Sequence, residues 1–347
     1  MNSAPMSASF QNRISHIFLS ITLAVFILFL ATEGTFARNP LSPADSLTAL
    51  LKDGGAYIQA KLYTKAEYYF MAALELDSIN RNALKNLGLA HSMRGKYVKS
   101  RKYLEIAVTA KVADAQIYNS LGLTYSYLKM PEKSVDSYRK AIALDPENYD
   151  YNRNISGELI TQGKFNDALL TLGKAIELQP NHGELRYLLG NAFSGLGDPQ
   201  SAIINYHLAV ENNYKSASLY YHLALAEEGT GNFWAAEEEF SKALALAPDS
   251  LEIRNRLGIL YVQTSAFEHA VRVFQKNLDR NSNYVNSRIG LGWAYAFQGD
   301  EASANKQLEI IRRDYPEKIE VMKDFIKQGL EYYKASQQNS GADSTSR

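Results

Sequence analysis

Apolar residues recur along this chain with a period of 34 residues, from Leu47 to Lys318, without an insertion or a deletion. In each 34-residue row, apolar or small residues predominate at columns 3, 7, 8 and 11, and again at columns 20, 24, 27 and 28. Positions three or four residues apart lie on one face of a helix, so each row predicts two amphipathic helices. The eight rows are 47–80, 81–114, 115–148, 149–182, 183–216, 217–250, 251–284 and 285–318.

Particular columns predict how the two helices of a row pack and where they end. Column 8 is small, as at Gly88 and Gly122, and column 24 is large, as at Leu104 and Tyr138. The small residue lets two helix backbones approach, and the large one fills the space beside them. A glycine at column 15, such as Gly95, suits the turn because glycine takes a positive φ at little steric cost. Proline at column 32 ends the second helix in four rows.

Leucine and glycine at columns 7 and 8, a large residue at column 24 and proline at column 32 resemble the signature of the tetratricopeptide repeat. The resemblance implies an all-α fold, a right-handed superhelical solenoid whose first helices line a concave groove. One hairpin cannot bury its own apolar face, so the stacked rows share one continuous core. The implied function is binding of a partner protein, as an extended peptide or a helix in the groove.

The two ends of the array depart from the repeat pattern. Residues 319–337 form an amphipathic segment after the last row, which predicts a capping helix, and residues 338–347 are predicted to be disordered. In the first row, Asp53 stands where leucine is usual, and Gly54 and Gly55 lie inside the first helix. Because each glycine costs about 1 kcal/mol of helix stability relative to alanine, we expect this helix to fray.

The first 37 residues have the organisation of an export signal. An uncharged apolar run at 17–31 follows Arg13, and its 15 residues suit a signal-peptide core better than a membrane span of about 20. Small residues at the −3 and −1 positions predict cleavage after Ala37, which leaves 38–46 as a linker. The alternative is an uncleaved membrane anchor at 17–31. Since the chain has no cysteine and hence no disulfides, we expect an exported protein of a bacterial envelope, periplasmic or secreted.

The net charge is zero, which argues against nucleic acid as a partner. The charge is nevertheless unevenly distributed. Row 81–114 has eight basic against two acidic residues, a net of +6, and row 217–250 has one against six, a net of −5. A basic patch in the first of these rows is either an ordinary solvated surface or a contact for an anionic partner. The contrast between the two rows would fix a partner's direction or support head-to-tail self-contact. The patch consists of Arg94, Lys96, Lys99, Arg101 and Lys102.

Columns 2, 5, 9, 12 and 13 of the first helices would line the groove, and they predict a polar first half and an apolar second half. Trp293 and Phe297 belong to no core column, so either the capping helix or a partner covers them. The candidate partner-binding residues are Tyr127, Arg153, Tyr187, Tyr221, Leu225, Asn255, Ile259, Ile289, Trp293 and Phe297.

The chain carries no pattern typical of an enzyme. Its six histidines do not form a metal-binding spacing, and there is no phosphate-binding loop or nucleophile elbow. We therefore expect no catalytic activity, no metal and no small-molecule cofactor. Two alternatives to a groove-binding scaffold stay open. One is a membrane-anchored structural component of an envelope assembly or secretion machine. The other is a binder of glycan or peptidoglycan through Tyr187 and Tyr221.

Overall fold

The computed structural model describes residues 43–344, with side chains to residue 338. Seventeen α-helices and one 3-10 turn account for the regular structure of this range. The first helices of the eight repeats are α2 (Pro43–Gln59), α4 (Arg81–Met93), α6 (Ala115–Tyr127), α8 (Tyr149–Thr161), α10 (Gly183–Gly195), α12 (Ala217–Gly229), α14 (Leu251–Gln263) and α16 (Val285–Phe297). The second helices are α3 (Tyr63–Leu76), α5 (Tyr97–Thr109), α7 (Pro131–Leu144), α9 (Phe165–Leu178), α11 (Pro199–Glu211), α13 (Phe233–Leu246), α15 (Phe267–Arg280) and α17 (Glu301–Asp314). The turn η1 (Pro316–Lys318) and α18 (Ile319–Ser344) follow the last repeat.

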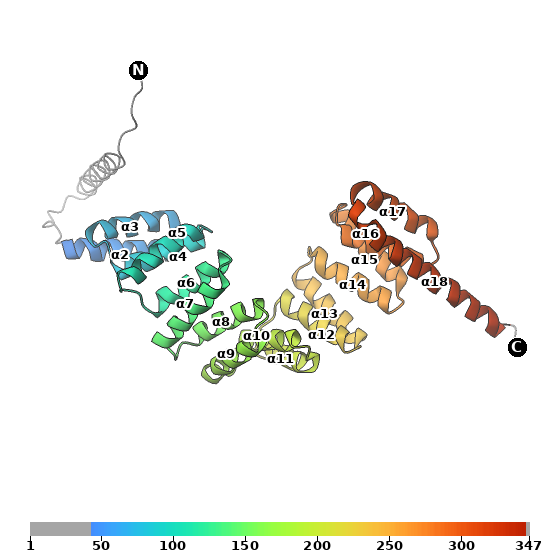
Figure 1. Cartoon of the computed structure of the whole chain (residues 1–347), viewed down its shortest axis with the longest axis horizontal. Coiled ribbons are helices and arrows are strands. Elements are labelled where there is room, and N and C mark those ends of the chain that lie inside the picture. Colours follow the sequence, from blue (N-terminus) through green and yellow to red (C-terminus); the bar gives the residue numbers. More distant parts are fainter. Residues whose placement is uncertain (1–42, 345–347) are drawn as a thin grey trace, which may run out of the picture.

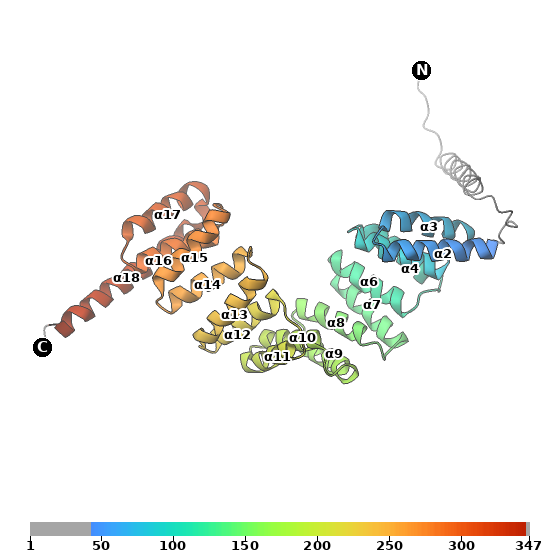
Figure 2. The same ribbon diagram turned by 180° about the vertical axis from the view of Figure 1, so that it is seen from behind.

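The helical hairpins stack side by side into a bowed array, with α2 and α3 at one end and α16 to α18 at the other (Figures 1 and 2). The first helices of neighbouring repeats lie against each other, as α4 lies against α6 and α6 against α8. The second helices of neighbouring described repeats show no comparable approach. In a curved stack the helices on the inner side approach one another more closely than those on the outer side. The first helices therefore line the concave face. The predicted all-α solenoid is confirmed.

Columns 8 and 24 form a close contact inside five hairpins, those of repeats one, two, three, five and seven, where column 8 is glycine. A Cβ atom at Gly122 would lie 2.5 Å from the Tyr138 ring, and one at Gly54 would lie 2.8 Å from the Phe70 ring. Glycine is therefore required at Gly54 by packing, and α2 runs unbroken through both glycines of the first row. The cost of that glycine to helix propensity is offset by a fully buried Phe70.

The turns of the hairpins use one backbone conformation whether or not glycine is present. Gly95 and Gly231 have φ values of 69° and 81°. Lys61, Lys129 and Ser265 occupy the same column in other repeats, and their φ values are 58° to 59°. These three residues adopt the left-handed region because the hairpin geometry imposes it, at a cost of order 1 kcal/mol each.

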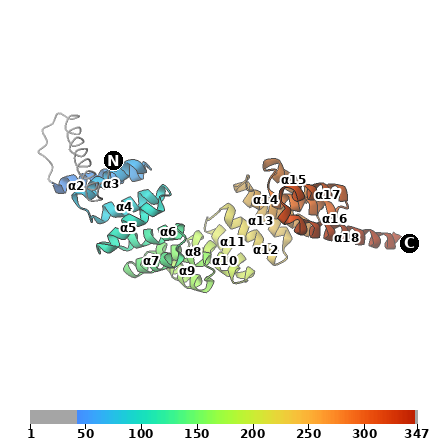
Figure 3. The same ribbon diagram turned by 45° about the horizontal axis from the view of Figure 1, so that its top comes forward.

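Both ends of the array differ from the boundaries expected from the sequence. Helix α2 begins at Pro43, so the last residues of the predicted linker are helical; proline is favoured in the first turn, where its missing N–H is not needed. Helix α18 continues to Ser344, beyond the predicted end of the capping helix at 337, because no proline follows to stop it. Its C-terminal part projects away from the repeats (Figure 3). The predicted signal segment 1–37 lies outside the described residues. None of the described helices is long and apolar enough to cross a membrane.

Candidate functional site

Polar side chains at column 5 of the first helices join several repeats to the next. The Lys85 ammonium donates to the Gln116 side chain at 2.7 Å. Arg153 donates to Glu184 at 3.2 Å. Glu184 occupies column 2 of the following repeat, as Gln116 does in its own repeat. Arg153 also pairs with Asp150, so its charge is neutralised by two acids. The polar groups of the concave face therefore hold the superhelix in register as well as facing the groove.

Two of the three candidate tyrosines, Tyr187 and Tyr221, take part in the same inter-repeat contacts. The Tyr187 hydroxyl lies 3.1 Å from Nδ1 of His222, and the Tyr221 hydroxyl donates to Glu252 at 3.3 Å. Tyr187 also stacks on Tyr214, with ring centroids 5.3 Å apart. Burial lowers the pKa of His222, which keeps its ring neutral beside the tyrosines. Both tyrosines are half-buried, so only part of each ring is open to the groove.

Four other candidates lie in repeats six to eight. Asn255 is 7% exposed and accepts a hydrogen bond from the Ser287 hydroxyl at 2.8 Å. Ile289 is 9% exposed and packs in the core that the capping helix completes. Their prediction as groove contacts is wrong, because the neighbouring repeat and the cap fill the space in front of them. Leu225 and Ile259 are half-buried against the cores of their own repeats.

The capping helix covers the aromatic pair of the last repeat. The ring of Trp293 lies 4.9 Å from that of Phe325, and the ring of Phe297 lies 5.0 Å from that of Tyr332. Phe297 also stacks on Phe267 at 4.9 Å. The sequence left open whether the capping helix or a partner covers Trp293 and Phe297. In the structure the capping helix covers them.

A different part of the concave face carries exposed apolar side chains. Leu89 and Met93 on α4 are 36% and 57% exposed, and Leu123 and Tyr127 on α6 are 44% and 55% exposed. These four residues, which we call the concave patch, occupy columns 9 and 13 of adjacent first helices. Tyr127 is braced by the ring of Tyr97, which stacks on it at 4.3 Å.

Sequence reasoning found Tyr127 but missed Leu89, Met93 and Leu123. The apolar groove residues predicted for the second half of the array are half-buried or buried in the structure, so they are less exposed than the concave patch. The signal was present, since all four residues stand in groove columns. What distinguishes them from Trp293 is that no later helix packs over them, and column positions do not reveal this.

The two helices that carry the concave patch have no acidic side chain. Helices α4 and α6 contain no aspartate or glutamate, and their basic residues are Arg81 and Lys85. The Arg81 guanidinium donates to the backbone carbonyl of Val112 at 2.7 Å, so it is used within the array. Asparagine side chains in the neighbouring groove columns hydrogen-bond to each other, as the Asn154 amide donates to the Asn119 side-chain oxygen at 2.8 Å.

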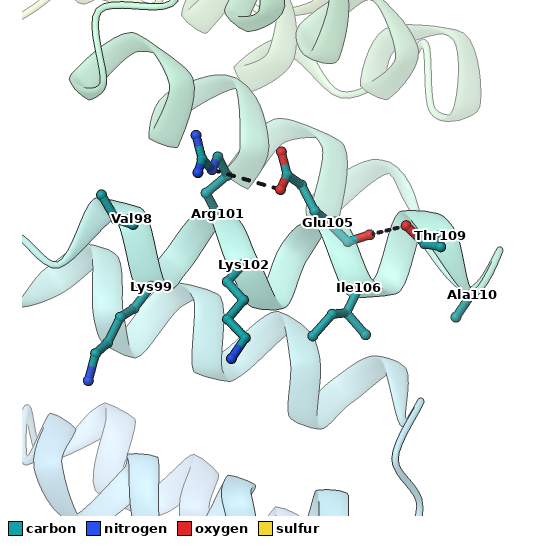
Figure 4. Close-up of a pocket in the computed structure, with 8 residues that line it drawn as sticks. All are labelled: Val98, Lys99, Arg101, Lys102, Glu105, Ile106, Thr109 and Ala110. Carbon is teal, nitrogen blue, oxygen red and sulfur yellow. Dashed lines mark hydrogen bonds and ion pairs between the residues drawn. The ribbon is translucent and has the colours of Figure 1, made fainter. Parts of the chain in front are cut away.

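The predicted basic patch is reduced by internal ion pairs. Arg94 lies 2.5 Å from a carboxylate oxygen of Glu67, and Arg101 lies 3.8 Å from Glu105. The three lysines of the patch remain, and Lys99 and Lys102 lie on the outer face of α5. Lys99 and Lys102 line a shallow depression of about 660 Å³ (Figure 4). The other lining residues are Val98, Arg101, Glu105, Ile106, Thr109 and Ala110.

Within residues 43–338 no three histidine, aspartate or glutamate side chains come together in a way that would hold a metal ion. The buried His91 has no hydrogen-bond partner on either ring nitrogen, and its Nε2 lies 3.7 Å from Glu67. It stacks on Tyr103 at 5.4 Å and occupies the column that Tyr125 fills in the next repeat. This histidine is therefore a packing residue of the hairpin.

Family models of the tetratricopeptide repeat match the chain at residues 115–148, at 158–212, 190–250 and 221–285, and at 288–318. Together these segments exceed half of the sequence. The chain belongs to the tetratricopeptide repeat family. Proteins of this fold are generally interaction scaffolds, which agrees with a protein-binding role and with the predicted lack of enzymatic activity.

Curated relatives are distant. The chain is 23% identical to the BBSome complex member BBS4 of Bos taurus over 217 residues, which cover 59% of this chain and 42% of that protein. It is 24% identical to the photosystem I assembly protein Ycf3 of Acaryochloris marina over 145 residues, 41% of this chain and 82% of that one. The chain thus spans less than half the length of BBS4.

Solved structures confirm the fold. A tetratricopeptide repeat protein from Parabacteroides merdae superposes with a TM-score of 0.56 and 16% identity, covering 71% of this chain and 97% of that one. PilF of Pseudomonas aeruginosa superposes with a TM-score of 0.52 and 18% identity, covering 60% of this chain and 95% of that one.

Proposed function

We propose that this tetratricopeptide repeat protein is a non-enzymatic scaffold that holds an extended peptide or a helix of a partner protein in its concave groove. The observation that carries the proposal is the concave patch of Leu89, Met93, Leu123 and Tyr127, which leaves four large apolar side chains exposed on the inner face. Contiguous exposed apolar side chains on a soluble surface are typical of interaction sites.

The shape of the array supports binding by many small contacts. The column 5 bonds between repeats, such as Lys85 to Gln116, fix the groove before a ligand arrives. The entropy cost of ordering then falls mostly on the ligand. Two helices without acidic residues and with exposed apolar side chains suit a segment that presents apolar side chains and whose charges are negative or absent. Distant relatives named as a complex member and as an assembly protein support a scaffold role.

The test is site-specific photo-crosslinking in the native cell. A photoreactive residue replaces Leu123 in the patch, and a matched control replaces Leu170, which is 71% exposed on α9. We expect a discrete cross-linked partner from position 123 that disappears when Met93 and Tyr127 are changed to alanine. Equal cross-linking from both positions, or none from position 123, would refute groove binding by the concave patch.

We also propose that the scaffold works in a bacterial cell envelope, after export and cleavage behind Ala37. The sequence of residues 1–37 supports this proposal. Sequencing the N-terminus of the mature protein tests it. A terminus at Arg38 fits a periplasmic or secreted scaffold, whereas an intact Met1 in the membrane fraction would favour the anchored component of an envelope machine.

The glycan alternative has less support. A sugar stacks on an open ring face, whereas Tyr187 and Tyr221 are both half-buried and Tyr187 already stacks on Tyr214. The hydroxyls of Tyr187 and Tyr221 already interact with His222 and Glu252. Binding of a protein segment over the exposed ring edges and the concave patch is therefore the better-supported function.

A further inference from the structure

Two of the second helices, α5 and α13, each carry an exposed apolar residue and a charged residue at the same repeat columns, and the two charges are opposite in sign. On the outer face of α5, Val98 is 62% exposed beside the depression, and Lys102 follows one helical turn later. Lys99 extends from the same helix (Figure 4). Neither lysine makes an ion pair with another described residue, although Lys102 lies 5.9 Å from the centre of the Tyr103 ring. Lysines that are not needed inside the repeat are available to an anionic surface.

Helix α13 carries the complementary features. Trp234 is 76% exposed, the highest value among the large hydrophobic side chains described, and nothing in the repeat covers it. Glu238 follows one turn later and pairs only within its own helix, with Lys242 at 2.7 Å. Such a surface pair within one helix is weak, so Glu238 can exchange it for a partner's lysine. Ser241 and Ala245 continue this face with small exposed residues, which lets another helix approach closely.

We propose that the outer face of α5 in one copy of the chain docks on the outer face of α13 in a second copy. Val98 and Trp234 share column 18, and Lys102 and Glu238 share column 22. With the two helices parallel and in register, the Trp234 ring covers Val98 at the mouth of the depression, and the Glu238 carboxylate reaches the lysines. The net charges of the two repeats, +6 and −5, favour this encounter over contact between like repeats.

Because the two surfaces are different, the contact is head-to-tail and leaves one unused surface on each end of a pair. It therefore extends to longer chains or closes into a ring. One helix pair buries less than the roughly 800 Å² per partner of a standard interface, so the association should be weak and sensitive to concentration. It should also weaken with salt, since its ion pairs lie at the surface. The concave patch stays free for the partner of the proposed function.

The experiment is sedimentation velocity on the mature protein over a concentration series at low and high salt. We expect the mean mass to rise with concentration at low salt and to fall towards the monomer at high salt. Trp234→Ala and Lys102→Glu should each hold the protein at monomer mass. The matched control is Leu170→Ala, which removes a side chain of similar exposure from α9 and should leave the mass unchanged.

A charge swap separates this contact from general stickiness. Lys102→Glu and Glu238→Lys should each be monomeric alone, because like charges then face each other in every pairing. An equimolar mixture of the two should assemble again, since each copy meets an opposite charge on its neighbour. A wild type that is monomeric at every concentration, or a mixture that stays monomeric while the wild type assembles, would overturn the proposal. Because all the substituted side chains are exposed, unchanged helical circular dichroism is expected throughout.

Discussion

The concave faces of repeats two and three and of repeat eight carry large apolar residues in the same columns, but only those of repeat eight are covered by another helix. Columns 9 and 13 hold Leu123 and Tyr127 in repeat three and Trp293 and Phe297 in repeat eight. The first pair is about half exposed, while the second lies against Phe325 and Tyr332 of the capping helix. One sequence position thus gives a binding surface or a core contact, depending on whether another element packs over it.

The comparison also suggests what a ligand does in the groove. Helix α18 lies on the first helix of the last repeat, with Met322 and Ile326 buried against α16. Its contact is an internal example of an amphipathic helix covering groove columns. A partner helix over the concave patch would make the same kind of contact without being part of the chain.

The largest expected effect comes from removing the cap. Deletion of residues 316–347 uncovers Trp293 and Ile289 and removes the buried Met322 and Ile326, each worth about 2–5 kcal/mol when truncated. We expect repeat eight to melt separately, at a lower temperature than the other repeats. Tryptophan fluorescence in a Trp234→Phe background reports this directly, because Trp293 is then the only tryptophan. An unchanged emission maximum after the deletion would mean that α18 does not shield it.

A matched pair of methionines sharpens the comparison. Met322 is fully buried under the cap and Met93 is 57% exposed in the concave patch. Met322→Ala should lower the free energy of unfolding by about 2–5 kcal/mol, and Met93→Ala should change it by about 0.5 kcal/mol or less. Urea unfolding followed by circular dichroism measures both. Equal losses would show that something in the protein already covers the concave patch.

Two glycines give effects of opposite sign. A Cβ at Gly329 of α18 would lie 2.7 Å from the Ala296 Cβ and 2.8 Å from the Phe297 nitrogen, whereas one at Gly157 meets nothing within 4 Å. Gly329→Ala should therefore push the cap off α16 at a cost of about 1–3 kcal/mol. Gly157→Ala should stabilise α8 by up to about 1 kcal/mol through helix propensity. The two melting temperatures, compared with the wild type, decide this prediction.

The sequence predicted what depends on a single repeat. The hairpins, the packing of Gly122 under Tyr138 and the turn at Gly95 follow from columns that every repeat shares. The burial of Asn255 and Ile289 was not predictable, because it depends on how the next repeat and the cap are placed. The end of α18 was misjudged because a polar segment without proline can prolong a helix that is already nucleated.

The smallest expected effect is a pH dependence of folding stability that arises in repeat two and not in the repeat under the cap. Burial holds the pKa of His91 below its usual 6.5, against the opposing attraction of Glu67 and with support from the nearby Lys99. As the pH falls below 6.5, the unfolded chain therefore takes up a proton that the folded protein does not, and stability decreases. Repeat eight and α18 contain no histidine, so their packing should not share this loss.

His91→Phe keeps a ring for Tyr103 to stack on and removes the titrating group. The loss of unfolding free energy between pH 7.5 and 5.5 should be smaller in this variant than in the wild type. Fluorescence of Trp293, again in the Trp234→Phe background, should report an environment that does not change over the same range. If His91→Phe and the wild type lose equal stability, the buried imidazole is not the source of the acid sensitivity, and His222, whose pKa burial also lowers, becomes the group to substitute next.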